Sequence, residues 1–232
     1  MDIPNASSPL PQSILQTRPY ALMLSTVKKL QMTEFSTQGL VTLKRIALNA
    51  HWIRRAVCFS LTGLPTQILE IYEYQSNRPD SAALALLEGN PEYKSVIRKS
   101  CKERKTELLH RMPYAPEAPP DSGSLFDDHI LYVTLEVQAD QIDRFKELMK
   151  QVLPLFEATS WTLQAAGWAS QPPTRVIHLW KSSTGNQLIE LMKRLAESSA
   201  YNELNEMTNQ RQELMHGIHV LKGIGNKPRP EE

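Results

Sequence analysis

The sequence predicts an α+β fold built from two tandem copies of a β-α-β-β-α-β unit, the ferredoxin-like order. A proline-rich stretch divides the 232 residues near their middle, and the same order of hydrophobic patterns lies on each side of it. Matching positions keep a regular spacing, because Tyr72 and Trp180, like Tyr93 and Tyr201, are 108 residues apart; near the end of the repeat the spacing becomes 106, which indicates one small insertion or deletion. A regular spacing between similar patterns indicates an internal repeat.

The proline-rich stretch supplies the boundary between the two halves. Four prolines between positions 113 and 120 cannot donate backbone hydrogen bonds, and they restrict the residues before them. Such a stretch favours a semi-extended linker. The chain therefore divides into a disordered lead-in (1–19), an N-terminal repeat (20–113), the linker (114–124), a C-terminal repeat (125–225) and a tail (226–232).

The C-terminal half shows the pattern of the unit most clearly. Residues 130–137 alternate between apolar and polar side chains, as a half-buried strand does. Asp140 then offers an N-cap, and apolar residues at helical spacing continue to Phe156. The remaining elements predicted here are strands at 161–169 and 176–180, helices at 188–195 and 201–214, and a final strand at 218–222.

The N-terminal half repeats this order. Residues 22–30 predict the first strand, and an apolar helical face follows at 40–53. The other predicted elements are strands at 56–62 and 68–74, a helix at 93–104 and a last strand at 108–114. Sequence identity between the halves is low, so the repeat rests on element order and on spacing.

Composition excludes several classes of protein. The formal charge of +1 is too balanced for a protein that grips phosphate backbones, so no nucleic acid partner is expected. No apolar run approaches the ~18 residues of a membrane span. Cys58 and Cys101 have neither metal-binding nor redox spacing, and the N-terminus does not resemble a signal peptide. These features together predict a cytoplasmic protein.

Motifs for common cofactors do not occur in the sequence. There is no glycine-rich phosphate loop and no G-x-S-x-G nucleophile elbow. His216 and His219 straddle a predicted helix end without further ligands nearby, so no metal site is predicted. The basic run at 98–105 is predicted to be a solvated helix face. The prediction is therefore a protein without cofactor or metal.

One hairpin in the C-terminal half carries a family resemblance. Gly167-Trp168, a short turn and a strand ending in His178-x-Trp180, followed by a helical stretch with Tyr201, resembles the NIPSNAP family of the dimeric α+β barrel superfamily. The resemblance covers about one hundred residues. It implies two four-stranded sheets that face each other as a pseudo-symmetric barrel, with the helices packed outside. In the first half, Glu70 and Tyr72 stand where the second half has His178 and Trp180.

Strand alternation predicts which side chains line the barrel. If Ile177 and Leu179 point at the helices, their neighbours on the strand point inward. The interior would then be aromatic with a few ionisable groups, as in a small-molecule pocket. The side chains predicted to line it are Val176, His178, Trp180, Tyr132, Thr134, Glu136, Glu70, Tyr72 and Tyr74, and Trp168 could join them.

His178 is the sharpest catalytic candidate. In a dry cavity it could move a proton as acid or base, assisted by Glu70 or Glu136. The alternative is a neutral histidine buried in the core. The two glutamates could equally lie on a wet face, and the aromatic residues Tyr72, Tyr74, Tyr132, Trp168 and Trp180 could bind substrate or simply fill the barrel.

Three functional hypotheses follow from the resemblance. The first is a cofactor-independent biosynthetic enzyme, of isomerase, cyclase or monooxygenase type, that acts on a hydrophobic or aromatic small molecule. The second is a non-catalytic barrel that binds small molecules or proteins, which a cavity too small for a ligand would favour. The third is heme binding. Sheet edges left exposed at the junction of the repeats would favour a homodimer.

Overall fold

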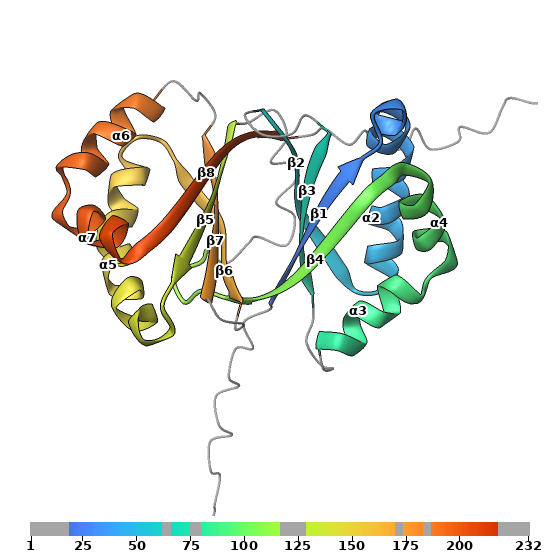
Figure 1. The fold of residues 1–232 in the computed structure, drawn as a ribbon, viewed down its shortest axis with the longest axis horizontal. Helices are drawn as coiled ribbons and strands as arrows, with labels where there is room; N and C mark the ends of the chain where they lie inside the picture. The colour runs from blue at the N-terminus through green and yellow to red at the C-terminus, as the bar shows by residue number, and fades with distance from the viewer. Residues whose placement is uncertain are drawn as a thin grey trace, which may run out of the picture.

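The structure is a computed structural model, and it describes residues 19–61, 66–74, 80–116, 129–169, 174–182 and 187–217, with backbone only at 80, 81, 83 and 210–217. Its strands form one closed barrel in the order β1-β3-β2-β8-β5-β7-β6-β4, which β1 and β4 close. Figure 1 shows the two curved halves of the barrel facing each other, with helices on the outer side of each.

The N-terminal repeat supplies four neighbouring strands of the barrel. Its strands are β1 (Tyr20–Val27), β2 (Trp52–Ser60), β3 (Gln67–Tyr74) and β4 (Cys101–Arg111). One continuous helical stretch after β1 consists of η1 (Lys29–Gln31), α1 (Met32–Glu34), η2 (Phe35–Gly39) and α2 (Leu40–Asn49). Two further helices, α3 (Asp80–Gly89) and α4 (Pro91–Ser100), lie between β3 and β4. Asn90 caps α4, because its Oδ1 accepts from the amides of Glu92 and Tyr93.

The C-terminal repeat has the same order. Its strands are β5 (His129–Val137), β6 (Thr162–Ala169), β7 (Thr174–Ser182) and β8 (Thr208–Gly217). Its helices are η3 (Ala139–Gln141), α5 (Ile142–Glu157), α6 (Leu188–Glu197) and α7 (Ser199–Met207). The predicted β-α-β-β-α-β order is therefore confirmed in both repeats, with the second helix of each divided in two.

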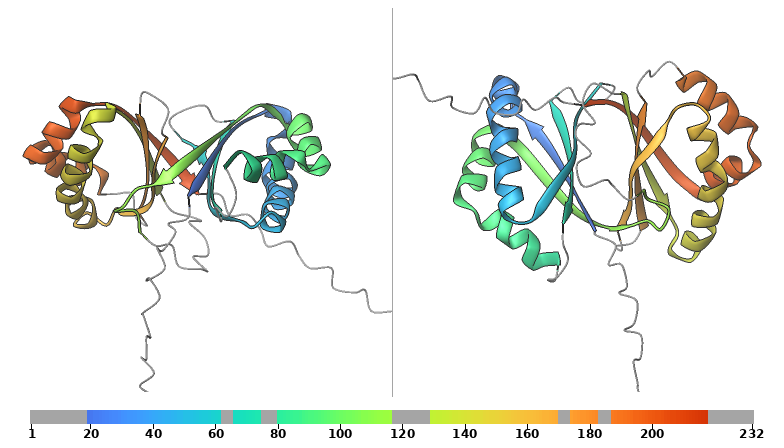
Figure 2. Two further views of the ribbon diagram at one scale, coloured as in Figure 1. Left: turned by 90° about the horizontal axis from the view of Figure 1, so that it is seen from below. Right: turned by 180° about the vertical axis from the view of Figure 1, so that it is seen from behind.

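Two short junctions join the repeats into a single barrel. Strand β2 pairs with β8 over residues 58–60, and β4 pairs with β6 at His110 and Arg111. The two views of Figure 2 show both sheets curving around a common interior, with the helices outside. Since these edge strands pair within one chain, the sheet-edge argument for a homodimer does not apply, and the homodimer stays a prediction.

The sheets are packed on both faces. One apolar cluster fills the space between the C-terminal sheet and its helices, and a second fills the matching space in the N-terminal repeat. A third cluster lies inside the barrel and draws on strands of both repeats, including Tyr20, Leu109, Tyr132 and Leu179. Strands that are buried on both faces carry apolar residues at nearly every position.

Several predicted elements have different boundaries in the structure. The helices predicted to run to Arg104 and Leu214 end at Ser100 and Met207, and each is followed directly by a long strand. Strand β2 begins at Trp52, so Ile53 is not on the preceding helix. Helix α3 is not among the predicted elements. The lead-in up to residue 18, linker residues 117–124, the strand predicted at 218–222 and the tail lie outside the described residues.

Two further observations concern membrane-spanning helices and metal sites. No helix within the described ranges is long and apolar enough to cross a membrane. No cluster of three or more His, Cys, Asp or Glu side chains that could hold a metal ion occurs in the part of the chain that the structure describes.

Candidate functional site

The face of β7 that carries His178 is turned toward the helices, not toward the barrel. His178 lies opposite Val133 in the pairing of β5 with β7, whereas Leu179 lies opposite Tyr132. Directly opposite residues share one face of a sheet. Because Tyr132 and Leu179 belong to the interior cluster, the prediction that Val176, His178 and Trp180 line the barrel is wrong. Trp168, opposite Val176, also packs on the helix side.

The same correction applies to the predicted residues of the N-terminal repeat. Glu70 pairs with Met23 and Val57, which belong to the cluster under the helices. Tyr72 and Tyr74 lie in that cluster too, and the ring of Tyr74 stacks on that of Trp52 at 4.8 Å between centroids. Apart from Tyr132 and Glu136, the candidate side chains of each repeat therefore lie between its own sheet and its own helices.

Glu70 is the centre of a buried charged network. It is 0% exposed, and its Oε1 accepts from Nη1 of Arg104 at 2.8 Å. Its Oε2 accepts from the Tyr72 hydroxyl at 2.6 Å and from Arg54 Nη1 at 3.4 Å. Burial alone would raise the pKa of Glu70, but the two arginines and the Tyr72 hydrogen bond outweigh it and lower that pKa. The carboxyl is therefore ionised.

Arg104 extends this network toward the helices. Its Nε donates to the hydroxyl oxygen of Tyr93 at 2.9 Å, and its Nη1 also donates to Ser25 Oγ at 2.5 Å. Its Nη2 faces the sulfur of Met23 at 2.8 Å, a weak acceptor. Burial would lower the pKa of Arg104, but Glu70 raises it, so the guanidinium is permanently charged.

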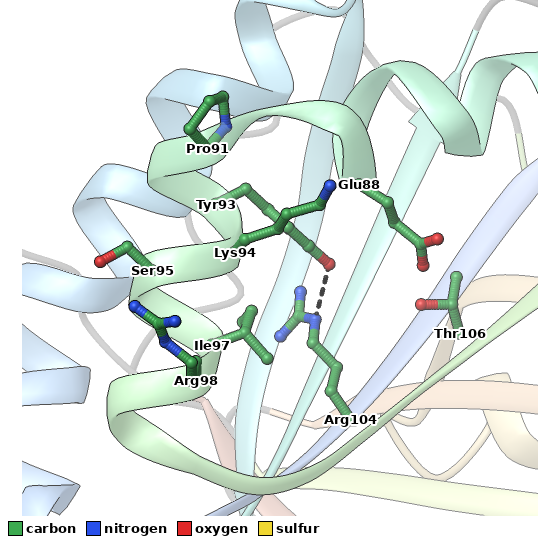
Figure 3. A pocket seen from close by; sticks show the side chains of 9 residues that line it. All are labelled: Glu88, Pro91, Tyr93, Lys94, Ser95, Ile97, Arg98, Arg104 and Thr106. Carbon is green, nitrogen blue, oxygen red and sulfur yellow. Dashed lines mark hydrogen bonds between the residues drawn. The ribbon is translucent and has the colours of Figure 1, made fainter.

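A pocket of about 650 Å³ opens over Arg104 and Tyr93. Figure 3 shows these two side chains at its centre, joined by their hydrogen bond, with the remaining side chains arranged around them. The pocket combines apolar surface with cationic groups, which suits a small hydrophobic molecule that carries an acidic group. Its lining residues are Glu88, Pro91, Tyr93, Lys94, Ser95, Ile97, Arg98, Arg104 and Thr106.

The matching space in the C-terminal repeat is apolar and aromatic. His178 is 2% exposed, and its Nε2 lies 2.7 Å from the hydroxyl of Tyr114. Burial lowers the pKa of His178 to about 3, so the imidazole is neutral. Phe145 and Trp180 flank its ring at 6.1 and 5.9 Å between centroids. An apolar cavity of about 30 Å³, which is about enough for one water, adjoins His178 and Trp180.

Trp180 is packed firmly in this compartment. Its ring stacks on Phe156 at 3.7 Å between centroids with an interplanar angle of 11°. Its Nε1 is buried and has no hydrogen-bond partner among the described residues. Trp168 lies at the edge of the compartment, with its ring 5.0 Å from that of His110.

The barrel interior holds the remaining predicted residues. The hydroxyl of Tyr132 accepts from Arg175 Nη2 at 3.3 Å, and Arg175 also pairs with Glu107 at 3.1 Å. Glu136 lies opposite Arg175 on the interior face and is exposed. Because His178 lies on the other face of the sheet and Glu70 belongs to the other repeat, the structure does not bring the three predicted catalytic residues together.

A heme, which the family resemblance admits, does not fit beside His178. The cavity there has a volume of about 30 Å³, far below that of a porphyrin. The Nε2 of His178 is also already hydrogen-bonded to the Tyr114 hydroxyl.

Comparisons with known proteins identify the fold. No protein-family model and no curated protein matches the sequence. Solved structures do match. A provisionally named monooxygenase from Lactobacillus acidophilus is 12% identical over 87% of this chain and 94% of its own, with a TM-score of 0.59. A provisionally named chlorite dismutase is 10% identical over 87% and 95%, with a TM-score of 0.61. An anthrone oxidase-like protein is 12% identical over 87% and 92%, with a TM-score of 0.54.

These solved structures share the overall architecture of this chain over most of its length. The chain has the dimeric α+β barrel fold. Identities this low show the fold alone and not an activity. A NIPSNAP domain protein from Burkholderia xenovorans matches over 43% of this chain with a TM-score of 0.34, so the NIPSNAP resemblance stays a prediction.

Sequence reasoning missed four side chains that define the two spaces. The sequence does not link Arg54 and Arg104 to Glu70, and it predicts a solvated helix face at Arg104, whose side chain is 5% exposed. It marks Tyr93 only as a repeat position. It places Tyr114 where the predicted last strand ends and the linker begins, whereas Tyr114 lies in a turn after β4. The usable signal was the buried Glu70 itself, because a carboxylate in a core needs a cationic partner.

Proposed function

We propose that this chain is a cofactor-independent enzyme of the monooxygenase type, acting on a hydrophobic or aromatic small molecule with an acidic hydroxyl or C–H group. The substrate would bind in the pocket over Arg104 and Tyr93. The observation that carries the proposal is a permanently charged, 5% exposed guanidinium at the floor of a substrate-sized pocket. A buried cation of this kind stabilises an anion far more strongly than a solvated one does.

The chemistry follows from what such oxygenation requires. Without a cofactor, the substrate must supply the electrons, so it first loses a proton to give an enolate or phenolate. Its carbanion carbon then forms a C–O bond to O2, and protonation of the adduct gives a hydroperoxide. Loss of water from a CH2-derived hydroperoxide leaves a carbonyl, so the carbon is oxidised and one oxygen atom ends in water.

The residues of the pocket divide these tasks. Arg104 would stabilise the substrate oxyanion, and Tyr93 would donate a hydrogen bond to it, since burial raises the pKa of Tyr93 and keeps its proton in place. Glu88 is the carboxylate that lines the pocket and is the candidate base. Glu70 does not line it and is a positioning residue, which holds Arg104 in place.

His178 was predicted as the acid–base residue, and it would serve that role only for a substrate inside the C-terminal compartment. The cavity there is about 30 Å³, against about 650 Å³ over Arg104. The N-terminal pocket is therefore the preferred substrate site.

The test measures O2 consumption with 1,8-dihydroxyanthrone, whose acidic CH2 and phenolic oxygens match the required chemistry. With a chelator present, wild-type protein should increase the rates of O2 consumption and quinone formation above the rates in buffer alone. The double variant Arg104→Met/Glu70→Gln, which removes one charge of each sign, should lose this activity while it stays folded. Arg144→Met, at an exposed ion pair, is the control. A folded double variant with wild-type turnover would remove Arg104 from the mechanism.

A second candidate function is a non-catalytic binding barrel. The filled C-terminal compartment, with Trp180 stacked on Phe156, favours it. Saturable binding of acidic aromatic compounds that depends on Arg104, without any O2 consumption, would support this function over the first.

A further inference from the structure

Tyr114 enters the C-terminal compartment from outside that repeat. It follows β4 of the N-terminal repeat, in a segment comprising residues 112–116. The amide of Met112 donates to the carbonyl of Ala166 at 2.9 Å, and the amide of Ala115 donates back to Met112 at 3.0 Å. The guanidinium of Arg111 also donates to the carbonyl of Ala115. The segment thus lies along β6 and carries the Tyr114 ring to His178.

The contact between Tyr114 and His178 has the geometry of a bound phenol. The two rings are 5.7 Å apart at an angle of 73°, and the hydroxyl oxygen lies 2.7 Å from Nε2. Burial raises the pKa of the Tyr114 hydroxyl and lowers that of His178. A neutral phenol and a neutral imidazole therefore share one hydrogen bond, in which the hydroxyl donates when the imidazole carries its proton on Nδ1.

The surroundings of this contact are aromatic. Tyr114 is half-buried as a residue, whereas His178 is 2% exposed. Phe145 stacks on the far side of the imidazole, at an interplanar angle of 28°. The indole nitrogen of Trp180 is a buried donor without a partner among the described residues, which a ligand oxygen could satisfy.

We infer that the C-terminal compartment is a second binding site, which takes a small uncharged phenol, and that the side chain of Tyr114 is a tethered occupant that the phenol replaces. The site offers one hydrogen-bonding atom, His178 Nε2, within an aromatic wall. It offers no charge, so a carboxylate would lose its hydration without compensation. The two repeats would then select their ligands by charge, acids over Arg104 and neutral phenols beside His178.

A tethered occupant lowers the apparent affinity for a free ligand. The apparent dissociation constant equals the intrinsic one divided by the fraction of time that the site is vacant. If Tyr114 leaves its place for about 1–10% of the time, a typical population for a minor state, its removal should tighten phenol binding about 10- to 100-fold. Removal of the hydroxyl alone should have a smaller effect of about 2- to 10-fold, since one neutral hydrogen bond is lost.

The experiment titrates p-cresol, which is the tyrosine side chain as a free molecule, against the full-length protein. Binding is followed by calorimetry and by the NMR signal of 13C-labelled histidine Cε1. Wild type should bind weakly, Tyr114→Phe more tightly and Tyr114→Ala most tightly. Toluene, which lacks the hydroxyl, should bind about 2- to 10-fold more weakly than p-cresol to Tyr114→Ala. His178→Phe in that background should abolish the difference between the two ligands.

Three results would overturn the inference. One is equal p-cresol affinity in wild type and Tyr114→Phe, which also decides the matter if Tyr114→Ala fails to fold. Another is equal binding of toluene and p-cresol, which would mean only an apolar cavity. The third is binding that leaves the His178 signal unmoved. None of these measurements involves O2 or Arg104, so their outcome is independent of the proposed monooxygenase function.

Discussion

Replacement of Glu70 with glutamine removes the carboxylate that balances two buried guanidinium groups. Glu70 is 0% exposed, and Arg54 and Arg104 pair with it at 3.4 and 2.8 Å from positions 4% and 5% exposed. Loss of one partner from a buried ion pair costs about 3–5 kcal/mol, because the remaining charge is left in a medium of low dielectric constant. At roughly 2–4 °C per kcal/mol for a chain of this size, the melting temperature should fall by roughly 6–20 °C.

The assay is urea unfolding at pH 7, followed by tryptophan fluorescence and far-UV circular dichroism. Glu136→Gln, at an exposed position of the barrel face, is the matched control and should change the unfolding free energy by less than about 0.5 kcal/mol. Glu70→Gln/Arg104→Met should recover part of the loss, since it removes an unpaired charge. A loss below about 1 kcal/mol for Glu70→Gln alone would refute the assignment of Glu70 as an essential buried counter-ion.

The pH dependence gives an independent check of the same ion pair. The folded pKa of Glu70 lies below its unfolded value of about 4.3. Ionised Glu70 therefore stabilises the fold fully above that unfolded pKa, and the contribution disappears as the pH falls through the folded pKa. The difference in stability between wild type and Glu70→Gln should be constant near neutral pH and should shrink below about pH 4.

Two further predictions concern the junction of the repeats and His178. A Cβ at Gly167 would lie 2.9 Å from Leu109 Cβ and 3.3 Å from the His110 carbonyl, so Gly167→Ala should cost about 1–3 kcal/mol in urea unfolding. Gly89→Ala, where nothing lies within 4 Å, should cost nothing; equal losses at both sites would contradict the close approach of β4 and β6. Burial holds the folded pKa of His178 at about 3, below the unfolded value of about 6.5, so its contribution to stability is complete above pH 6.5 and declines as the pH falls toward 3. His178→Phe should flatten that part of the stability curve, and an unchanged slope between pH 6 and 4 would show that His178 is not buried as a neutral group.

The element order was predictable because most helices and strands of this chain have one apolar face or a continuous apolar run. The end of each second helix was not. Residues 101–111 contain Lys, Glu, Arg and Leu, which are good helix formers, yet they form β4 by pairing with β1 along its length. The hydrogen-bond partners of β4 are far away in the sequence, so no local pattern reports them.

The second feature that the sequence could not predict was which side chains of a strand point to the helices and which point to the barrel interior. In β7, every residue from Val176 to Trp180 is buried, because helices cover one face and the barrel interior the other. Alternation identifies a face only where one side is polar. The cross-strand partner decides it instead, and Tyr132, which lies in an alternating strand, was assigned correctly through its own pattern.

The two repeats carry different polar side chains at equivalent buried positions, and these side chains have different hydrogen-bond partners. Position 70 holds a carboxylate whose cationic partners, Arg54 and Arg104, come from strands of the same repeat. Position 178 holds an imidazole whose partner, Tyr114, comes from the segment that follows β4. The ion pair with Glu70 holds Arg104 beside Tyr93, whereas the Tyr114 phenol occupies the hydrogen-bonding position beside His178. Divergence of a single repeat position, together with its partner, therefore gives one repeat a buried ion pair and the other a neutral hydrogen bond.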